Sequence, residues 1–293
     1  MWLSRARLSA WLRHPVIKAS SNLRKKIVRQ LAGISCVFEL AFDHGLCELI
    51  ANGSAAMELA RSAHTRTVFD LDLNYLALMV TEMGGLVEQQ IAQGLDALAS
   101  RNSGLALQVI DRDLALTTLQ SRIEEKGINI IAQRQPLAND LREIISAMHI
   151  TSDLERLGEL AKNISKRTIM IGTDTLPMSL VLGLRHMTQV VLERVKMALD
   201  SYADHDIDEA LAVWNGDQEI DALNNALFHE TLAHMSQDPQ NIAGCTQFLF
   251  CVKNLERAGD HATNIAEAVH YIISGHLPAG ERPKQNTLHF QKL

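Results

Sequence analysis

The residues with the clearest capacity for chemistry are carboxylates that recur in two copies of one motif. The copies, 101 residues apart, are Asp153-Leu-Glu-Arg-Leu-Gly-Glu-Leu-Ala-Lys-Asn-Ile164 and Asn254-Leu-Glu-Arg-Ala-Gly-Asp-His-Ala-Thr-Asn-Ile265. Side chains four residues apart on a helix share one face, within about 6 Å of each other. Glu155 and Glu159 therefore form one pair of carboxylates, and Glu256 and Asp260 form a second pair. Like charges so placed repel, and a cation would relieve the repulsion.

The second half of the chain offers two further carboxylates, Asp217 and Asp221, also four residues apart. If they lie on a helix that faces the motif helix, four carboxylates converge with Glu256 and Asp260. Ligands that are all oxygen suit hard cations, so we expect a divalent or ferric ion, namely iron, manganese or magnesium rather than zinc. We list Asp217, Asp221, Glu256 and Asp260 as one candidate metal site.

The first half carries a reduced version of the same set. Asp113 stands where the second half has Asp217, but Thr117 replaces the second carboxylate. We therefore list Asp113, Glu155 and Glu159 as a weaker metal site. An alternative stays open, because acidic pairs on helices often lie on solvated faces, where neighbouring basic side chains contribute a few tenths of a kcal/mol each. In that case the chain is a plain helical scaffold.

Composition and charge exclude several classes of protein. The chain has 293 residues, of which 47% are hydrophobic and only 4% aromatic, which favours helices. Residues 1–63 hold 9 Lys and Arg against 4 Asp and Glu, whereas 64–293 hold 19 against 30. An acidic body argues against nucleic-acid binding. No apolar run reaches the length of a membrane span, the four cysteines show no disulfide or zinc spacing, and no catalytic motif is present. We expect a cytoplasmic protein that is not an enzyme.

Hydrophobic periodicity predicts three helices in each half. We expect them at 70–98, 105–134 and 137–170, and again at 178–202, 207–235 and 242–274, because Gly and Pro residues interrupt the pattern between them. The domains then follow in order. They are a poorly ordered basic extension (1–63), a first three-helix repeat (64–172), a second three-helix repeat (173–276) and a loose tail (277–293).

The duplicated motif, together with Arg134-Gln-Pro-Leu-Ala-Asn-Asp-Leu-Arg142 before its first copy, resembles the PhoU family of phosphate-transport accessory proteins. The resemblance covers about residues 66–276. It implies an all-α fold of two tandem antiparallel three-helix bundles related by pseudo-twofold symmetry. It also implies that metal binds at Glu256 with Asp260, at Asp217 with Asp221, and at Glu155 and Glu159 with Asp113.

The resemblance further implies a regulatory function. A member of this family is expected to repress the phosphate-starvation response by coupling the phosphate ABC transporter, through its ATPase, to a sensor histidine kinase. It is expected to form a homodimer and to reach the membrane through its partners. The alternative from a different class is a metal-binding helical bundle with redox or metal-storage activity. A di-iron bundle needs two Glu-x-x-His motifs, however, and only Glu267-Ala-Val-His270 is of that kind.

Overall fold

The computed structural model describes residues 55–172, 176–280 and 282, and of residues 55–67 only the helical backbone. By contacts the chain divides into two units, Met1–Asn74 and Tyr75–Leu293. The described part of the first unit is the beginning of α4. The helices are α4 (Ala55–Ser100), α5 (Ser103–Arg134), α6 (Ala138–Ile171), α7 (Met178–Asp204), α8 (Ile207–Asn215), α9 (Asp217–Gln237) and α10 (Ile242–Ser274), with a short 3-10 helix η2 (Pro239–Asn241).

Local sequence signals set the ends of these helices. The Asn102 side chain accepts a hydrogen bond from the Leu105 backbone N–H at 3.0 Å and so caps the start of α5. Asp206 caps α8 in the same way. Gly275 ends α10 with a φ of 81°, a left-handed conformation that glycine adopts without steric cost. The polar and glycine residues that interrupt the hydrophobic pattern therefore mark real helix boundaries.

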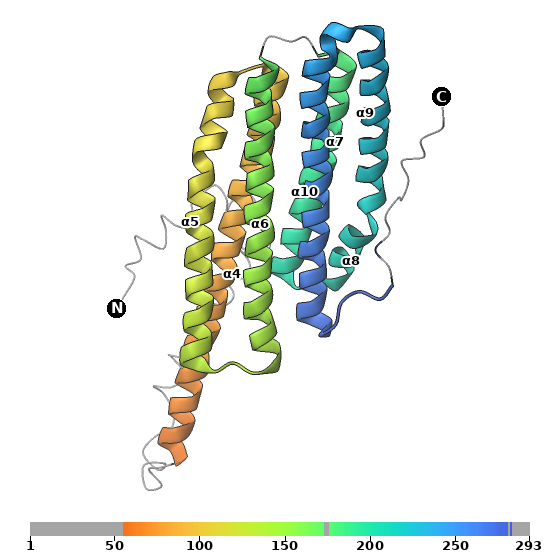
Figure 1. The fold of residues 1–293 in the computed structure, drawn as a ribbon. Coiled ribbons are helices and arrows are strands. Elements are labelled where there is room, and N and C mark those ends of the chain that lie inside the picture. Colours follow the sequence, from red (N-terminus) through yellow and green to blue (C-terminus); the bar gives the residue numbers. More distant parts are fainter. Residues whose placement is uncertain (1–54, 173–175, 281, 283–293) are drawn as a thin grey trace, which may run out of the picture. The chain divides into compact units, whose positions relative to one another are not determined.

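The second unit is built from two antiparallel three-helix bundles in tandem, as predicted. The first contains α4 from Tyr75 onward, α5 and α6, and the second contains α7, α8 with α9, and α10 (Figure 1). The last helices of the two bundles, α6 and α10, pack against each other, so the duplicated motif lies where the repeats meet. Every described element is helical, and no described helix is both long enough and apolar enough to cross a bilayer.

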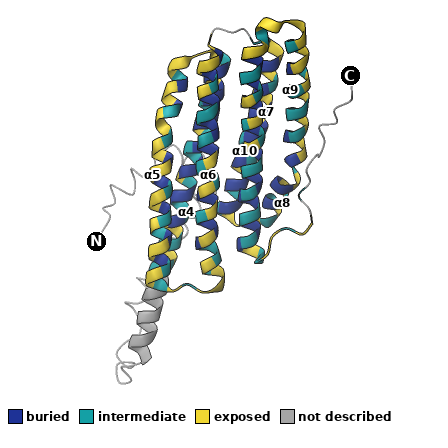
Figure 2. Ribbon diagram, in the orientation of Figure 1, coloured by how far each residue is buried: buried dark blue, intermediate teal, exposed yellow. Residues whose placement is uncertain are grey.

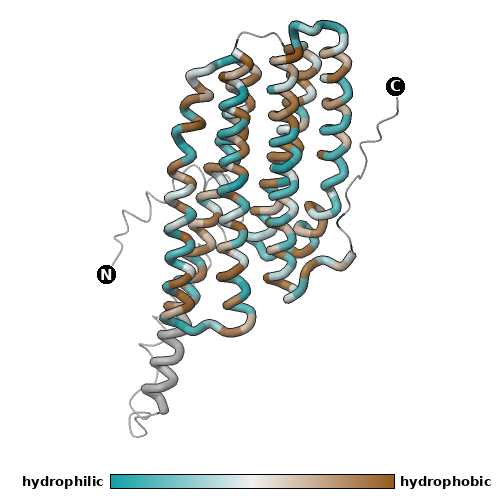
Figure 3. Tube along the Cα trace, viewed as in Figure 1, coloured by the Kyte–Doolittle hydropathy of each residue, from teal (hydrophilic) through white to brown (hydrophobic). Residues whose placement is uncertain are grey.

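The core of each bundle follows from the hydrophobic face of its last helix. Ile144, Ile150 and Leu154 of α6 are fully buried, as is Phe248 of α10. Figure 2 shows the buried residues on the sides of the helices that face one another, and Figure 3 shows hydrophobic residues in the same places. Burial of these faces is the main favourable contribution to the fold. It also fixes which motif residues remain outside the core.

The expected helices agree with the structure at α5, α6, α7 and α10, and two predictions were wrong. Helix α4 begins at Ala55 rather than near Asp70, because residues 55–69 contain no Gly or Pro and are rich in good helix formers. The single helix expected at 207–235 is broken into α8 and α9. Gly216, with φ −86° and ψ 0°, ends one helix and starts the next.

The expected domain boundaries fall partly outside the described residues. Most of the basic extension (1–63) and most of the tail (277–293) are not described. Of the tail, residues 277–280 and Arg282 are described, and Arg282 turns out to matter for the site.

Candidate functional site

The two copies of the motif contact each other directly across α6 and α10. Asp153, the first residue of the first copy, accepts a hydrogen bond from the imidazole Nδ1 of His261 at 2.8 Å. It also accepts one from the side-chain amide of Asn264 at 3.2 Å. Asp153 and His261 are only about one-fifth exposed (19% and 18%), so this contact is shielded from water. These motif residues therefore hold the two repeats together.

The glycines of the motif are explained by the neighbouring helix. A Cβ atom on Gly158 of α6 would collide with the Leu116 side chain of α5, and one on Gly259 of α10 would collide with Ile220 of α9. Each glycine costs about 1 kcal/mol relative to alanine inside a helix. The neighbouring helix therefore approaches closely in both bundles, which brings the acidic residues of α5 and α9 near the motif helices.

In the second bundle, the structure brings Asp217 and Asp260 together around one guanidinium group. Arg282 lies between them, with its Nε 3.2 Å from Asp217 Oδ2 and its Nη2 2.9 Å from Asp260 Oδ1. Its Nη2 also donates to Asp217 Oδ1 at 3.2 Å. Glu256 is instead paired within α10, because Lys253 Nζ lies 2.7 Å from its Oε2. The predicted convergence therefore holds for Asp217 and Asp260, whereas Glu256 has a cation of its own.

Asp217 is the most buried of the predicted carboxylates, at 5% exposure. Burial raises the pKa of its carboxyl group. The Arg282 guanidinium opposes this change and lowers the pKa, while Asp260 and Asp221 raise it. Two of the other predicted carboxylates, Asp260 and Asp221, therefore lie close enough to Asp217 to affect it. Arg282 supplies the opposite charge.

In the first bundle, the cation beside Asp113 comes from the motif helix α6. Lys162 Nζ lies 2.6 Å from Asp113 Oδ2, and the two side chains are 21% and 16% exposed. Glu159 is paired with Arg156 at 2.6 Å on the same helix, and that hydrogen bond lowers the pKa of Glu159. Glu155 also has Arg156 as its neighbour, at 3.9 Å. Lys162, which forms the ion pair with Asp113, also lowers the pKa of Glu159.

The type of these side chains suits a hard metal ion, but their arrangement does not. Within the described part of the chain, no three His, Cys, Asp or Glu side chains converge as a metal-binding group. Lys253, Arg156, Lys162 and Arg282 stand beside the carboxylates that would serve as ligands. Binding of a metal by these residues stays a prediction, and it would require one of these cations to move.

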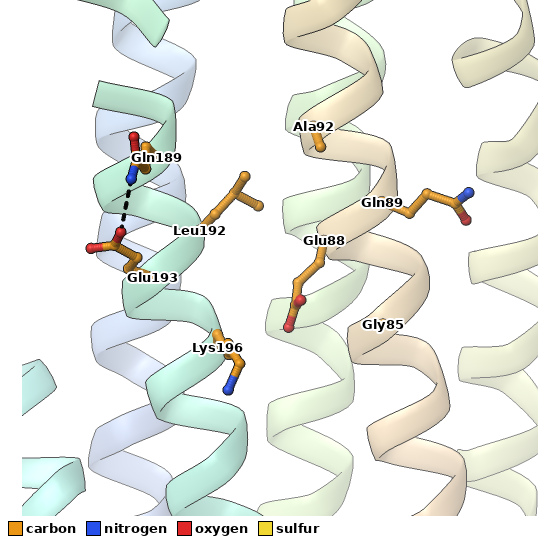
Figure 4. A pocket seen from close by; sticks show the side chains of 8 residues that line it. All are labelled: Gly85, Glu88, Gln89, Ala92, Gln189, Leu192, Glu193 and Lys196. Carbon is orange, nitrogen blue, oxygen red and sulfur yellow. Dashed lines mark hydrogen bonds between the residues drawn. The ribbon is translucent and has the colours of Figure 1, made fainter. Parts of the chain in front are cut away.

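A second feature is a pocket of about 460 Å³ between α4 and α7. Figure 4 shows Glu88 on α4 and Lys196 on α7 on facing sides of it. Burial raises the pKa of Glu88, and Lys196 lowers it. Gly85 and Ala92, which also line the pocket, leave the space open because their side chains are small or absent. This pocket lies between the first helix of one bundle and the first helix of the other.

Sequence reasoning missed three of these residues. Arg282 was overlooked because it lies in a segment expected to be loose. Glu88 and Lys196 were overlooked because neither belongs to the motif. A helical face with Gly85, Glu88 and Ala92 at spacings of three and four was a readable signal, since small residues permit close approach of another helix. Nothing in the sequence around Arg282 indicated its partners.

The fold and the duplicated motif define a class, that of proteins built from two tandem three-helix repeats whose motif helices pack together. The sequence model of the PhoU domain matches this chain twice, at residues 80–168 and 184–269. These two matches correspond to the two bundles and include both copies of the motif. The chain belongs to the PhoU family.

Named relatives and solved structures agree with this assignment. A phosphate-specific transport system accessory protein PhoU homolog from Rhizobium meliloti is 46% identical over 224 residues, which are 76% of this chain and 94% of that protein. A homolog from Caulobacter vibrioides is 44% identical over 226 residues, covering 77% and 98%. The crystal structure of PhoU from Pseudomonas aeruginosa is similar with a TM-score of 0.68 and 36% identity, covering 71% of this chain and 99% of that one.

Proposed function

We propose that this protein is a regulatory adaptor of phosphate homeostasis. In this proposal it represses the phosphate-starvation response by coupling the phosphate ABC transporter, through its ATPase, to a sensor histidine kinase. The observation that carries the proposal is the 46% identity to a phosphate-specific transport system accessory protein across 94% of that protein's length. Similarity over nearly the whole relative supports a shared role rather than a shared fragment.

The contacts that the duplicated motif makes support an adaptor rather than a catalyst. The motif residues Asp153, His261 and Asn264 are used to join the two bundles. A rigid pair of bundles offers long helical faces for partner proteins. We propose that the protein acts in the cytoplasm as a homodimer, and that it associates with the membrane only through the transporter.

The proposal includes a metal ion, iron, manganese or magnesium rather than zinc, at the acidic helix faces. The all-oxygen donor set of Asp217, Asp221 and Asp260 supports that choice. The rival function is redox or metal-storage chemistry, and it is disfavoured because Glu159, Asp113, Glu256 and Asp260 each have a lysine or arginine beside them.

The test uses the full chain in its own cells. A tagged copy is purified from phosphate-replete and phosphate-starved cells, and the captured proteins are identified. The proposal predicts capture of the transporter ATPase and of a histidine kinase in phosphate-replete cells, and a starvation reporter that becomes active on deletion of the gene. If the reporter is unchanged on deletion and neither partner is captured, the proposed function is wrong. Oxygen consumption by the iron-loaded protein would support the rival.

A further inference from the structure

Phe250 on α10 is an exposed aromatic residue in a chain in which only 4% of the residues are aromatic, and 48% of its surface is exposed. The guanidinium of Arg167, from α6, lies over its ring, with Cζ 4.5 Å from the ring centroid. Arg167 Nη1 also donates to Gln247 Oε1 at 2.9 Å and lies 3.8 Å from the Sδ of Met170, which is 60% exposed. These contacts hold the arginine over the ring and present two apolar side chains at the surface.

Three further cations lie on the same faces of these two helices. On α6, Lys166 is four residues before Met170, so the two side chains share one face. On α10, Lys253 and Arg257 are three and seven residues after Phe250, again on one face. All three cations are exposed. We call the set of six residues the Phe250 surface: Lys166, Arg167, Met170, Phe250, Lys253 and Arg257.

The Phe250 surface is positively charged although the body of the chain is acidic. Four of its six residues are cations, whereas residues 64–293 hold 19 Lys and Arg against 30 Asp and Glu. Glu256 pairs with Lys253. Lys166 and Arg167, however, form no ion pair with any carboxylate in the described part of the chain. A cationic area of this kind attracts a negatively charged partner.

The other end of the α6–α10 pair provides an internal comparison. The copies of the motif are 101 residues apart, so each position on one helix has a counterpart on the other. At the counterpart positions, His149 replaces the phenylalanine, Glu267 replaces the lysine of α6 and Ala268 replaces the arginine of α6. Both ends pack the two helices together. Packing alone therefore does not account for the exposed phenylalanine and its cations.

The chemistry of the Phe250 surface fits another protein better than a second copy of this chain or a membrane. Twofold pairing of two copies through this surface would place its cations against each other. A membrane is disfavoured, because the ring lies beneath a guanidinium and only two apolar side chains are available for burial in lipid. Aromatic, methionine and arginine side chains are the types enriched at protein–protein interfaces.

We propose that the Phe250 surface is a docking site for an acidic segment of a partner protein. The segment places an apolar side chain against Phe250 and Met170 and its carboxylates beside the surrounding cations. This inference rests on the adaptor role in the proposed function and assigns one of its contacts to a particular face. Because the attraction is between exposed charges, binding weakens as the salt concentration rises.

The test is site-specific photo-crosslinking in the organism's own cells under phosphate-replete conditions. The full-length chain carries Phe250→p-benzoylphenylalanine, and the matched control carries His149→p-benzoylphenylalanine. Crosslinked peptides are identified by mass spectrometry after irradiation. We expect position 250 to crosslink to a peptide of net negative charge from another protein, and position 149 not to reach that peptide. A crosslink from position 250 to lipid, to a second copy of this chain or to a neutral or basic peptide, or no crosslink, would overturn the proposal.

A charge reversal tests the contribution of the cations. Lys166→Glu should lower the yield of the crosslink about threefold or more, because a like charge would then face the acidic segment. Arg185→Glu, at an exposed position of α7, makes the same change in net charge and should leave the yield unchanged. The melting temperatures of both variants should stay within about 2 °C of the unaltered chain, since both positions are exposed. Equal yields from the two variants would overturn the proposal.

These outcomes separate the inference from the proposed function. If position 250 crosslinks to an acidic peptide of a protein other than the transporter ATPase or a histidine kinase, the docking site stands and the proposed partners are wrong. If the unaltered chain captures both proposed partners but position 250 crosslinks to neither of them nor to any other protein, this inference alone fails.

Discussion

The two bundles present the same acidic position on differently built helices. In the first, α5 runs without a break through Asp113, and Lys162 from α6 neutralises the aspartate. In the second, the matching helix is broken at Gly216, so Asp217 lies in the first turn of α9. A helix N-terminus carries partial positive charge and stabilises an acidic residue there. The two bundles therefore share the carboxylate but differ in the groups that neutralise it.

The break at Gly216 also has a specific neighbour. A Cβ atom at that position would collide with the guanidinium of Arg194, whose Nη2 lies 2.9 Å from Glu219 Oε2. Arg194 of α7 thus covers the junction of α8 and α9 and binds the first turn of α9. In the second bundle, two arginines from different segments contact acidic residues in the first turn of α9. Arg194 binds Glu219, and Arg282 binds Asp217. The first bundle uses a lysine from its own motif.

The largest effect in this comparison is expected at the two motif glycines. Gly158→Ala should collide with Leu116 and Gly259→Ala with Ile220, and each should lower the free energy of unfolding by about 1–3 kcal/mol. Urea denaturation measures this change. Gly94→Ala is the control, because its added Cβ would have no neighbour closer than 3.4 Å. If both motif variants are as stable as Gly94→Ala, the close helix approach is not what requires glycine.

The next effect concerns the lysine of the first bundle. Lys162→Gln leaves the mostly buried Asp113 carboxylate without its cation, and we expect a loss of about 1–2 kcal/mol, between the values for exposed and fully buried pairs. Lys166→Gln, an exposed position one turn further along α6, should change stability by less than about 0.5 kcal/mol. Chemical denaturation of both variants checks this. Equal stability of the two would show that the Lys162–Asp113 pair contributes nothing.

A smaller effect is expected where the repeats join. Asp153→Ala removes the acceptor of the His261 and Asn264 hydrogen bonds and should cost about 1 kcal/mol, with a partly buried donor left unpaired. Hydrogen exchange of α6 and α10 should increase together, because Asp153 links the two bundles. Faster exchange confined to α6 would show that it does not.

The smallest effect is a pH dependence of the stability of the second bundle. Burial raises the pKa of Asp217 above its unfolded value, so the stability that protonation of this group contributes is fully present below about pH 3.8 and is lost as the pH rises through the folded pKa. Arg282 lowers that pKa, and Arg282→Gln should therefore raise it further. The melting-temperature difference between this variant and the unaltered chain should be larger at pH 7 than at pH 4. A difference independent of pH would contradict this explanation.

The sequence predicted the duplication and most of the helix boundaries. Hydrophobic periodicity and interruptions by Gly and Pro located α5, α6, α7 and α10 well, because those signals act locally. The break at Gly216 was missed, since a single glycine inside a helical pattern is often tolerated. What stabilises the break is Arg194, which comes from another helix.

The site was predicted less completely, for a related reason. The match between halves placed Asp217 near Asp260, and Arg282 contacts both. Glu256, predicted to pair with Asp260, instead has Lys253 beside it. The sequence did not predict that Arg282 neutralises Asp217, because the two residues are 65 positions apart. Contacts of that separation depend on how the tail folds back, which no local pattern encodes.

The most direct test of the account is a pair of double-mutant cycles, which isolate the coupling between two side chains. One cycle combines Asp113→Asn with Lys162→Gln, and the other combines Asp217→Asn with Arg282→Gln. The account predicts a favourable coupling of about 0.5–3 kcal/mol in both cycles. The contradicting result is a coupling energy of zero between Asp217 and Arg282 together with a favourable coupling between Asp113 and Lys162. It would show that Arg282 does not neutralise Asp217 in the way that Lys162 neutralises Asp113.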